Sequence, residues 1–108
     1  MSDHFYHTDD MKQLRKLREL KPDLFKSFVE FDTKVFEAGT LSVKIKELIA
    51  VGTAHITQCP YCIDAHTKRA KKAGASDAEI AEAIFVAMAL RAGGSWAHSA
   101  IAMKALEE

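Results

Sequence analysis

The sequence predicts an all-α protein, a bundle of about six helices that forms an obligate homo-oligomer. Only two prolines and five glycines interrupt the 108 residues. The apolar residues recur mostly at intervals of three and four, the spacing of one helix face. A chain of this length makes about one domain. We therefore expect a flexible tail over residues 1–10 and a single helical domain over residues 11–108.

Two helices are predicted in the first part of this domain. One covers residues 11–20 and is interrupted at Pro22, because proline cannot continue a preceding helix. The second begins at Pro22 and runs to about Ala38, where Gly39 is a typical residue to follow a helix end. Its apolar stripe has helical spacing and consists of Leu24, Phe28, Phe31 and Val35.

The middle of the chain predicts two more helices. Ser42 can cap a helix that runs from Val43 to about Thr57. Pro60 suits the first turn of the next one, because its missing N–H group would have no helical partner there. Gly74 closes this fourth helix. The two helices are therefore expected to be joined by a short turn.

A capping box over residues 76–79 opens a fifth helix. From Ala81 to Leu90 this helix has almost no polar face, and a helix that is apolar all round must be covered on more than one side. So small a chain supplies few covering helices, which is why we expect an oligomer. Gly93-Gly94 is expected to bend or end the helix, or to let another backbone approach closely. Residues 96–106 would then continue as a sixth segment.

The composition argues against some classes of binding partner. Fifteen basic and fifteen acidic residues cancel, so no overall field favours nucleic acid or an anionic membrane. The first residues have neither the basic start nor the apolar run of a secretory signal, and no apolar run reaches the roughly 18 residues of a membrane span. We expect a cytoplasmic protein whose partners are small molecules or other proteins.

Both cysteines of the chain lie in one motif, Cys59-Pro60-Tyr61-Cys62. In a reducing compartment such a pair is more often catalytic, redox-sensing or metal-binding than structural. A disulfide between them would close so short a loop that it stabilises the fold by only about 2 kcal/mol. We therefore interpret the pair as a site of redox chemistry that needs no cofactor.

The residues around the pair can activate a thiol. Cys59 would be the N-cap of the fourth helix and Cys62 would lie in its first turn, where the helix dipole favours a thiolate. His66 lies four residues after Cys62, on the same helix face, and can accept or return a proton. Glu47 lies within an apolar segment of the preceding helix. It either turns toward His66 or Cys62, or is a solvated charge beside two lysines.

The spacing of Glu47, Cys59, Cys62 and His66 resembles that of the AhpD-like (alkylhydroperoxidase D) branch of the carboxymuconolactone decarboxylase family. The resemblance covers roughly residues 41–92. It implies an AhpD-like helical bundle that forms trimers or hexamers. It also implies a thiol-dependent peroxidase that reduces alkyl or hydrogen peroxide. Cys62 would attack the peroxide, Cys59 would resolve the intermediate, and Glu47 with His66 would relay protons. An external dithiol of unknown identity would restore the thiols.

One position departs from this pattern. Tyr61 stands where the best-characterised AhpD-type site has a histidine that joins the relay. A tyrosine hydroxyl ordinarily releases its proton only in alkaline solution. The relay would therefore be shorter, or would be completed by His55 on the preceding helix, and Tyr61 itself is the other possible relay residue.

Two other interpretations use the same residues. The cysteine pair and His66 could supply three zinc ligands, with Glu47 or His55 as the fourth, although structural zinc sites usually have a second ligand pair well downstream. An oligomeric helical scaffold or regulator with a reversible disulfide would share every residue with the peroxidase and would differ only in its turnover.

Overall fold

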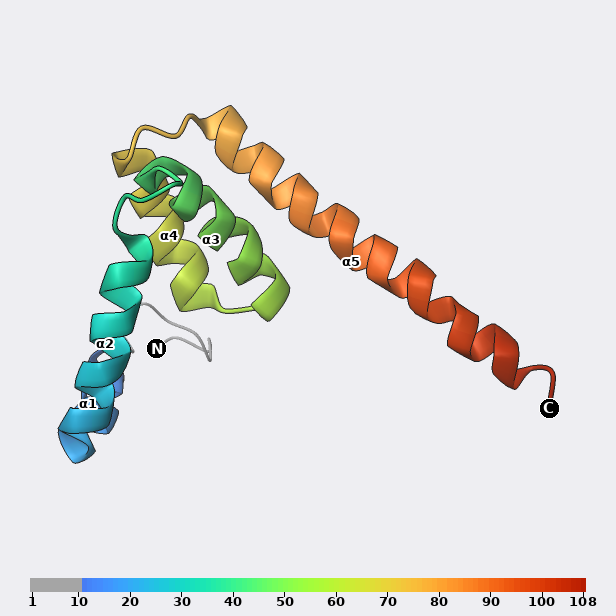
Figure 1. The fold of residues 1–108 in the computed structure, drawn as a ribbon, viewed down its shortest axis with the longest axis horizontal. Coiled ribbons are helices and arrows are strands. Elements are labelled where there is room, and N and C mark those ends of the chain that lie inside the picture. The colour runs from blue at the N-terminus through green and yellow to red at the C-terminus, as the bar shows by residue number, and fades with distance from the viewer. Residues whose placement is uncertain (1–10) are drawn as a thin grey trace, which may run out of the picture.

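In the computed structural model, which describes residues 11–108, the chain forms five helices and no strand (Figure 1). The helices are α1 (Met11–Leu20), α2 (Pro22–Phe36), α3 (Val43–Thr57), α4 (Pro60–Lys72) and α5 (Asp77–Ala105). These bounds confirm the all-α prediction and the starts of the first five expected helices. The predicted tail over residues 1–10 lies outside the described residues. The end of α2 comes earlier than expected, because Glu37 already has an extended backbone.

The central part of the fold is the hairpin of α3 and α4. The Ser42 side chain accepts a hydrogen bond from the backbone N–H of Ile45 and so caps α3. At the other end of α3, Gln58 adopts a left-handed conformation with φ 58°, which ends the helix and reverses the chain. Cys59 and Pro60 follow as the N-cap and first residue of α4. The cysteine motif therefore begins α4 beside the C-terminal end of α3.

Helix α5 begins as the sequence predicts but continues further. Ser76 and Glu79 form the capping box, in which each side chain bonds to the backbone of the other residue. The helix then runs without interruption through Gly93 and Gly94, so the prediction of a bend and a sixth segment is wrong. A Cβ atom at either glycine would meet nothing within 4 Å, so no backbone approaches closely there within residues 11–108.

The unbroken α5 is long and apolar enough to be compared with a membrane-spanning helix. By length and composition alone, α5 is the one helix among the described residues that could cross a membrane. The core helix of a soluble protein can meet the same criterion. The buried residues of α5 are Ile80 and Ala87, both in its first half, and 11% of its apolar window is buried.

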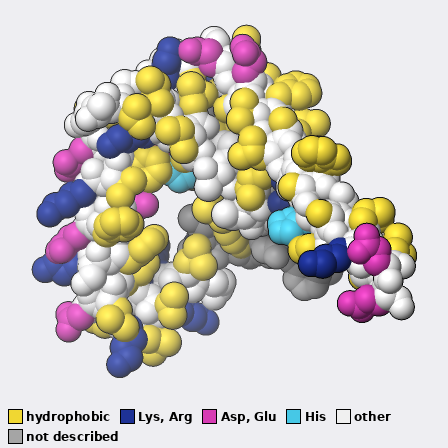
Figure 2. All heavy atoms as spheres, turned by 45° about the vertical axis from the view of Figure 1, so that its right-hand side comes forward, with side chains coloured by type: hydrophobic (Ala, Val, Ile, Leu, Met, Phe, Trp, Pro, Cys, Tyr) yellow, Lys and Arg dark blue, Asp and Glu magenta, His cyan; other side chains and the backbone are white. Residues whose placement is uncertain are grey.

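The core of the described chain is small and lies around α3. Val51 is the one large side chain that is fully buried. Gly52 of α3 packs close to α5, since a Cβ atom added to it would lie 3.2 Å from the Ala83 carbonyl oxygen. The buried apolar residues are Val51, Ala54, Ala70, Ala75, Ile80 and Ala87. Many larger apolar side chains remain exposed, and Figure 2 shows them along the arm formed by α5.

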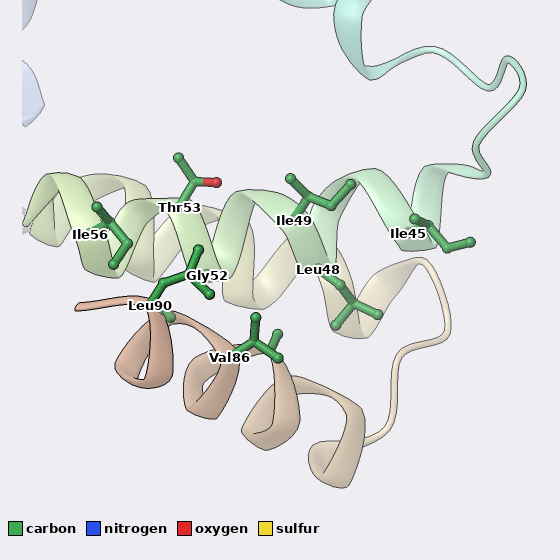
Figure 3. Close-up of a pocket in the computed structure, with 10 residues that line it drawn as sticks. Ile45, Leu48, Ile49, Gly52, Thr53, Ile56, Val86 and Leu90 are labelled. Atoms are coloured by element: carbon green, nitrogen blue, oxygen red, sulfur yellow. The ribbon is translucent and has the colours of Figure 1, made fainter. Parts of the chain in front are cut away.

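Two arms leave the central hairpin in different directions (Figure 1). One is the helix pair α1–α2 and the other is the second half of α5. Together they give the chain extents of 53 × 34 × 34 Å. A groove of about 340 Å³ lies between α3 and α5 and is almost wholly apolar. Figure 3 shows its walls, with Ile49 and Ile56 from α3 and Val86 and Leu90 from α5.

Candidate active site

Cys59 and Cys62 form a disulfide across the first turn of α4. Their Cα atoms are 5.2 Å apart, and the backbone N–H of Cys62 donates to Cys59 Sγ over 3.2 Å. This confirms that the two sulfurs lie within bridging distance. When the bond is reduced, the positive end of the α4 dipole still lies at this turn and favours a thiolate.

One helical turn after Cys62, His66 forms a short hydrogen bond with Glu47 of α3. The distance from His66 Nδ1 to Glu47 Oε1 is 2.6 Å, and the two side chains are 15% and 5% exposed. The sequence left open whether Glu47 turns inward or is solvated, and the structure decides for the inward position. A buried carboxylate needs such a partner, because an unpaired one would be costly to remove from water.

The Glu47 contact has a chemical consequence for His66. If Nδ1 carries the proton donated to the carboxylate, the neutral ring has an unprotonated Nε2. That nitrogen can accept a proton from a thiol and later return it to a leaving group. The carboxylate also stabilises the imidazolium that forms in between. The pair is therefore suited to proton transfer beside Cys62.

A cavity of about 560 Å³ joins these residues to the surface. It lies between α2, α3 and the start of α4, and its lining is mostly apolar. The lining residues are Asp32, Val35, Phe36, Leu41, Lys46, Ile49, Ala50, Thr53, Ala54, Thr57, Cys62 and His66. Cys62 and His66 belong to this wall, whereas Cys59 and Glu47 do not. A small molecule in the cavity would thus meet one cysteine and the histidine.

Phe36 is a member of this site that the sequence analysis missed. Its ring stacks on the His66 ring, with the centroids 5.0 Å apart and the planes at 22°. The guanidinium carbon of Arg69 lies over the Phe36 ring, 5.9 Å from its centroid. Thirty positions separate Phe36 from His66, and no local spacing rule connects residues so far apart. The aromatic residue at the end of α2 was the one available signal.

The two possible relay residues are close to the cysteine pair in the sequence. His55 is half-buried on α3, and its Nδ1 lies 2.7 Å from the carbonyl oxygen of Val51 in the same helix. Tyr61 is half-buried in the first turn of α4, between the cysteines. A relay role for either residue stays a prediction.

The zinc interpretation gains no support from the geometry. Within residues 11–108, no group of three or more histidine, cysteine, aspartate or glutamate side chains lies where it could hold a metal ion. The two sulfurs bond to each other, and His66 bonds to Glu47.

A scan against protein-family models matches residues 22–105 to the carboxymuconolactone decarboxylase family. The chain belongs to this family. The resemblance found from the motif is therefore confirmed at the family level. The family includes enzymes, both decarboxylases and AhpD peroxidases, and its fold is that of a soluble protein. The apolar α5 is accordingly read as a helix of a soluble fold.

The chain is similar to proteins from several microbes. A Paracoccus denitrificans protein named uncharacterized protein 4 in cox locus is 45% identical over 82 residues, which are 76% of this chain and 74% of that protein. A crystal structure of an apo carboxymuconolactone decarboxylase family protein from Legionella pneumophila is 36% identical with a TM-score of 0.73, covering 99% of this chain and 97% of that one. A Methanobacterium thermoautotrophicum crystal structure is 32% identical with a TM-score of 0.75, covering 79% and 96%.

Proposed function

We propose that this protein is a cytoplasmic thiol-dependent peroxidase that reduces alkyl or hydrogen peroxide with Cys59 and Cys62. The observation that carries the proposal is the buried Glu47–His66 hydrogen bond of 2.6 Å, one helical turn from a cysteine pair that forms a disulfide. A structural disulfide needs no buried proton relay beside it. A catalytic thiol needs a base to accept its proton and an acid to return one.

The reaction begins with the reduced protein. The Cys62 thiolate attacks one peroxide oxygen, the O–O bond breaks, and His66 gives its proton to the leaving alkoxide or hydroxide. The products are an alcohol or water and a Cys62 sulfenic acid. The Cys59 thiol then attacks this sulfur, which releases water and forms the disulfide. An external dithiol returns two electrons and two protons by thiol–disulfide exchange.

The cavity supports the roles of the two cysteines. Cys62 lines it together with His66, whereas Cys59 is not part of its wall. A peroxide that enters from solvent would therefore meet Cys62 first. Glu47 lies behind His66 and would hold the ring and its charge without touching the substrate.

We also propose that the working molecule is a homo-oligomer, a trimer or a hexamer. Large apolar side chains are exposed on both arms, and Phe28 of α2 and Trp96 of α5 are 59% and 79% exposed. Monomers rarely expose so much contiguous apolar surface, and second copies of the chain are the partner that would cover it. Light scattering of the purified protein would give the mass of the assembly.

The exposed arms also favour the second candidate function, an oligomeric scaffold or regulator with a reversible disulfide. Such a protein would need the assembly and the disulfide but not the buried relay. The two functions differ in turnover, because a regulator would be oxidised once and slowly, whereas a peroxidase would cycle.

The deciding experiment mixes reduced protein with one equivalent of tert-butyl hydroperoxide or hydrogen peroxide and counts the remaining thiols. The proposal expects the rapid loss of two thiols per chain and continued peroxide consumption when dithiothreitol is supplied. Cys62→Ser should abolish the reaction. Cys59→Ser should still lose its one thiol to sulfenic acid but form no intramolecular disulfide. Intact thiols, or activity that survives Cys62→Ser, would contradict the proposal.

A further inference from the structure

The His66 ring is held on two sides by residues from two different helices. Glu47 of α3 bonds to its Nδ1 atom, and Phe36 of α2 stacks on its face with a centroid distance of 5.0 Å. The hydrogen bond alone fixes one edge of the ring. The second side-chain torsion of histidine has broad energy wells, so a single edge contact leaves the ring free to tilt. A stacked neighbour removes that freedom.

The position of Phe36 in turn depends on Lys46. The Lys46 ammonium donates to the carbonyl oxygens of Val35 and Glu37, over 2.7 and 2.6 Å. These two carbonyls flank Phe36 in the chain and lie at the end of α2, where helical carbonyls lack partners within the helix. The two hydrogen bonds therefore fix the backbone from which the Phe36 side chain extends.

Lys46 and Glu47 are adjacent residues of α3 and act on opposite ends of the same arrangement. Glu47 holds the edge of His66, while Lys46 holds the end of α2 that carries Phe36. Arg69 adds a cation over the Phe36 ring from α4. Three helices thus converge on one imidazole beside Cys62.

We propose that Phe36 is a positioning residue, which fixes the plane of the His66 ring for proton exchange with Cys62, and that Lys46 holds Phe36 in place. Proton transfer requires the donor and acceptor atoms to stay close to hydrogen-bonding geometry. A tilted His66 would keep its chemistry but lose part of that geometry. The consequence for catalysis rests on the proposed peroxidase, whereas the consequence for the His66–Glu47 bond does not.

Four variants in a Cys59→Ser background test the proposal. Phe36→Leu keeps an apolar side chain but removes the stacking face, and Phe36→Tyr restores that face. Lys46→Met removes both hydrogen bonds to α2 without touching either ring. The matched control is Phe31→Leu, which makes the same change on the same helix at a position that is 68% exposed.

Two measurements are made on the reduced proteins without peroxide. The first is the NMR signal of the His66 Nδ1 proton, which is deshielded and slow to exchange while the bond to Glu47 persists. The second is the rate at which iodoacetamide alkylates Cys62. We expect Phe36→Leu to lose the proton signal and to slow alkylation about fivefold, because the stabilisation that an aromatic pair adds beyond its buried area corresponds to a factor of this size. Lys46→Met should show the same two changes, while Phe36→Tyr and Phe31→Leu should resemble the parent.

The proposal is overturned if Phe36→Leu keeps both the signal and the rate. It is also overturned if Phe36→Tyr is as impaired as Phe36→Leu, because the stacking face would then be irrelevant. If Phe36→Leu does not fold, Lys46→Met alone decides, since a normal proton signal in that variant contradicts the arrangement. A parent protein that consumes no peroxide would refute the proposed function but would leave the result for His66 unchanged.

Discussion

The α3–α4 hairpin and the outer half of α5 differ in how far their side chains find partners within the single chain. In the hairpin the buried polar groups have partners, as Glu47 has in His66, and Val51 is fully buried. In the outer half of α5, Trp96 and Ile101 are 79% and 69% exposed, although their side chains are among the most apolar in the chain. The first region, together with Phe36 at the end of α2, brings a chemical site together within one chain. The second exposes apolar side chains that the proposed oligomer would cover.

This difference separates two kinds of residue. Substitutions in the hairpin should act on the chemistry of the cysteines and leave the assembly intact. Substitutions in the outer half of α5 should act on assembly and stability and leave the site geometry intact. Each of the following changes tests one side of that separation.

The largest effect is expected from Glu47→Gln. The amide keeps the shape and an acceptor oxygen, but it lacks the charge that stabilises a protonated His66. Loss of effective acid–base catalysis typically costs about a hundredfold or more in rate, so we expect at least that drop in the rate of Cys62 oxidation by peroxide. Stopped-flow thiol oxidation would measure it.

Glu82→Gln is the matched control, because Glu82 is exposed on α5. It should retain the parent rate. An equal loss in both variants, or a mass change in Glu47→Gln by light scattering, would show that the hairpin and the assembly are not separable.

The next largest effect is expected from Trp96→Glu in the outer half of α5. If a second copy covers this side chain, the substitution removes apolar burial worth about 2 kcal/mol per chain and adds an unpaired charge at the interface. We expect a smaller mass by light scattering and a lower melting temperature. The disulfide should still form when the protein is oxidised.

Lys104→Glu also introduces a glutamate at an exposed position of the same helix, and it makes the charge more negative by two units instead of one. Its mass should match that of the parent. A Trp96→Glu protein with unchanged mass and melting temperature would mean that this face of α5 is not an interface.

The sequence was most informative where the structure depends on near neighbours. Ser42, Pro60 and the Ser76 capping box predicted where helices begin, because a cap and its partner lie within four residues. The relation of Cys62 to His66 follows from helical spacing in the same way. The Glu47–His66 contact also depends on α4 folding back on α3. The sequence therefore indicated Glu47 as a candidate site residue but not which residue it contacts.

Two features could not be predicted, for different physical reasons. The stacking of Phe36 on His66 depends on how α2 docks, which no residue pattern within α2 specifies. The continuation of α5 through Gly93 and Gly94 was predicted wrongly. Glycine weakens a helix by about 1 kcal/mol relative to alanine, but helix propagation is cooperative and the flanking segments contain many good helix formers. Two glycines are therefore tolerated where no competing turn is stabilised.

A smaller effect is expected at the start of α5, where the helix follows the α3–α4 hairpin in the chain. Ser76→Ala removes the oxygen that accepts from the Glu79 backbone N–H, and losing an N-cap costs about 1 kcal/mol. Urea unfolding at constant protein concentration should show that loss with no change in mass. Ser99→Ala, on the exposed outer half of the helix, should change stability much less. A larger loss for Ser99→Ala would place the dominant stabilisation of α5 outside its cap.

The smallest effect concerns the ion pair that joins the start of α5 to α3. The Lys44 ammonium donates to Glu79 over 2.9 Å, and this bond, with that from the Ser76 backbone, holds the pKa of the Glu79 carboxyl below its ordinary value of 4.5. Because the folded state lowers this pKa, the stabilisation is fully present above pH 4.5 and is lost as the pH falls through the lower, folded value. The melting temperature of Glu79→Gln should therefore lie slightly below that of the parent at pH 7. The gap should close in acid, whereas a gap that persists at low pH would show that the carboxylate charge is not its source.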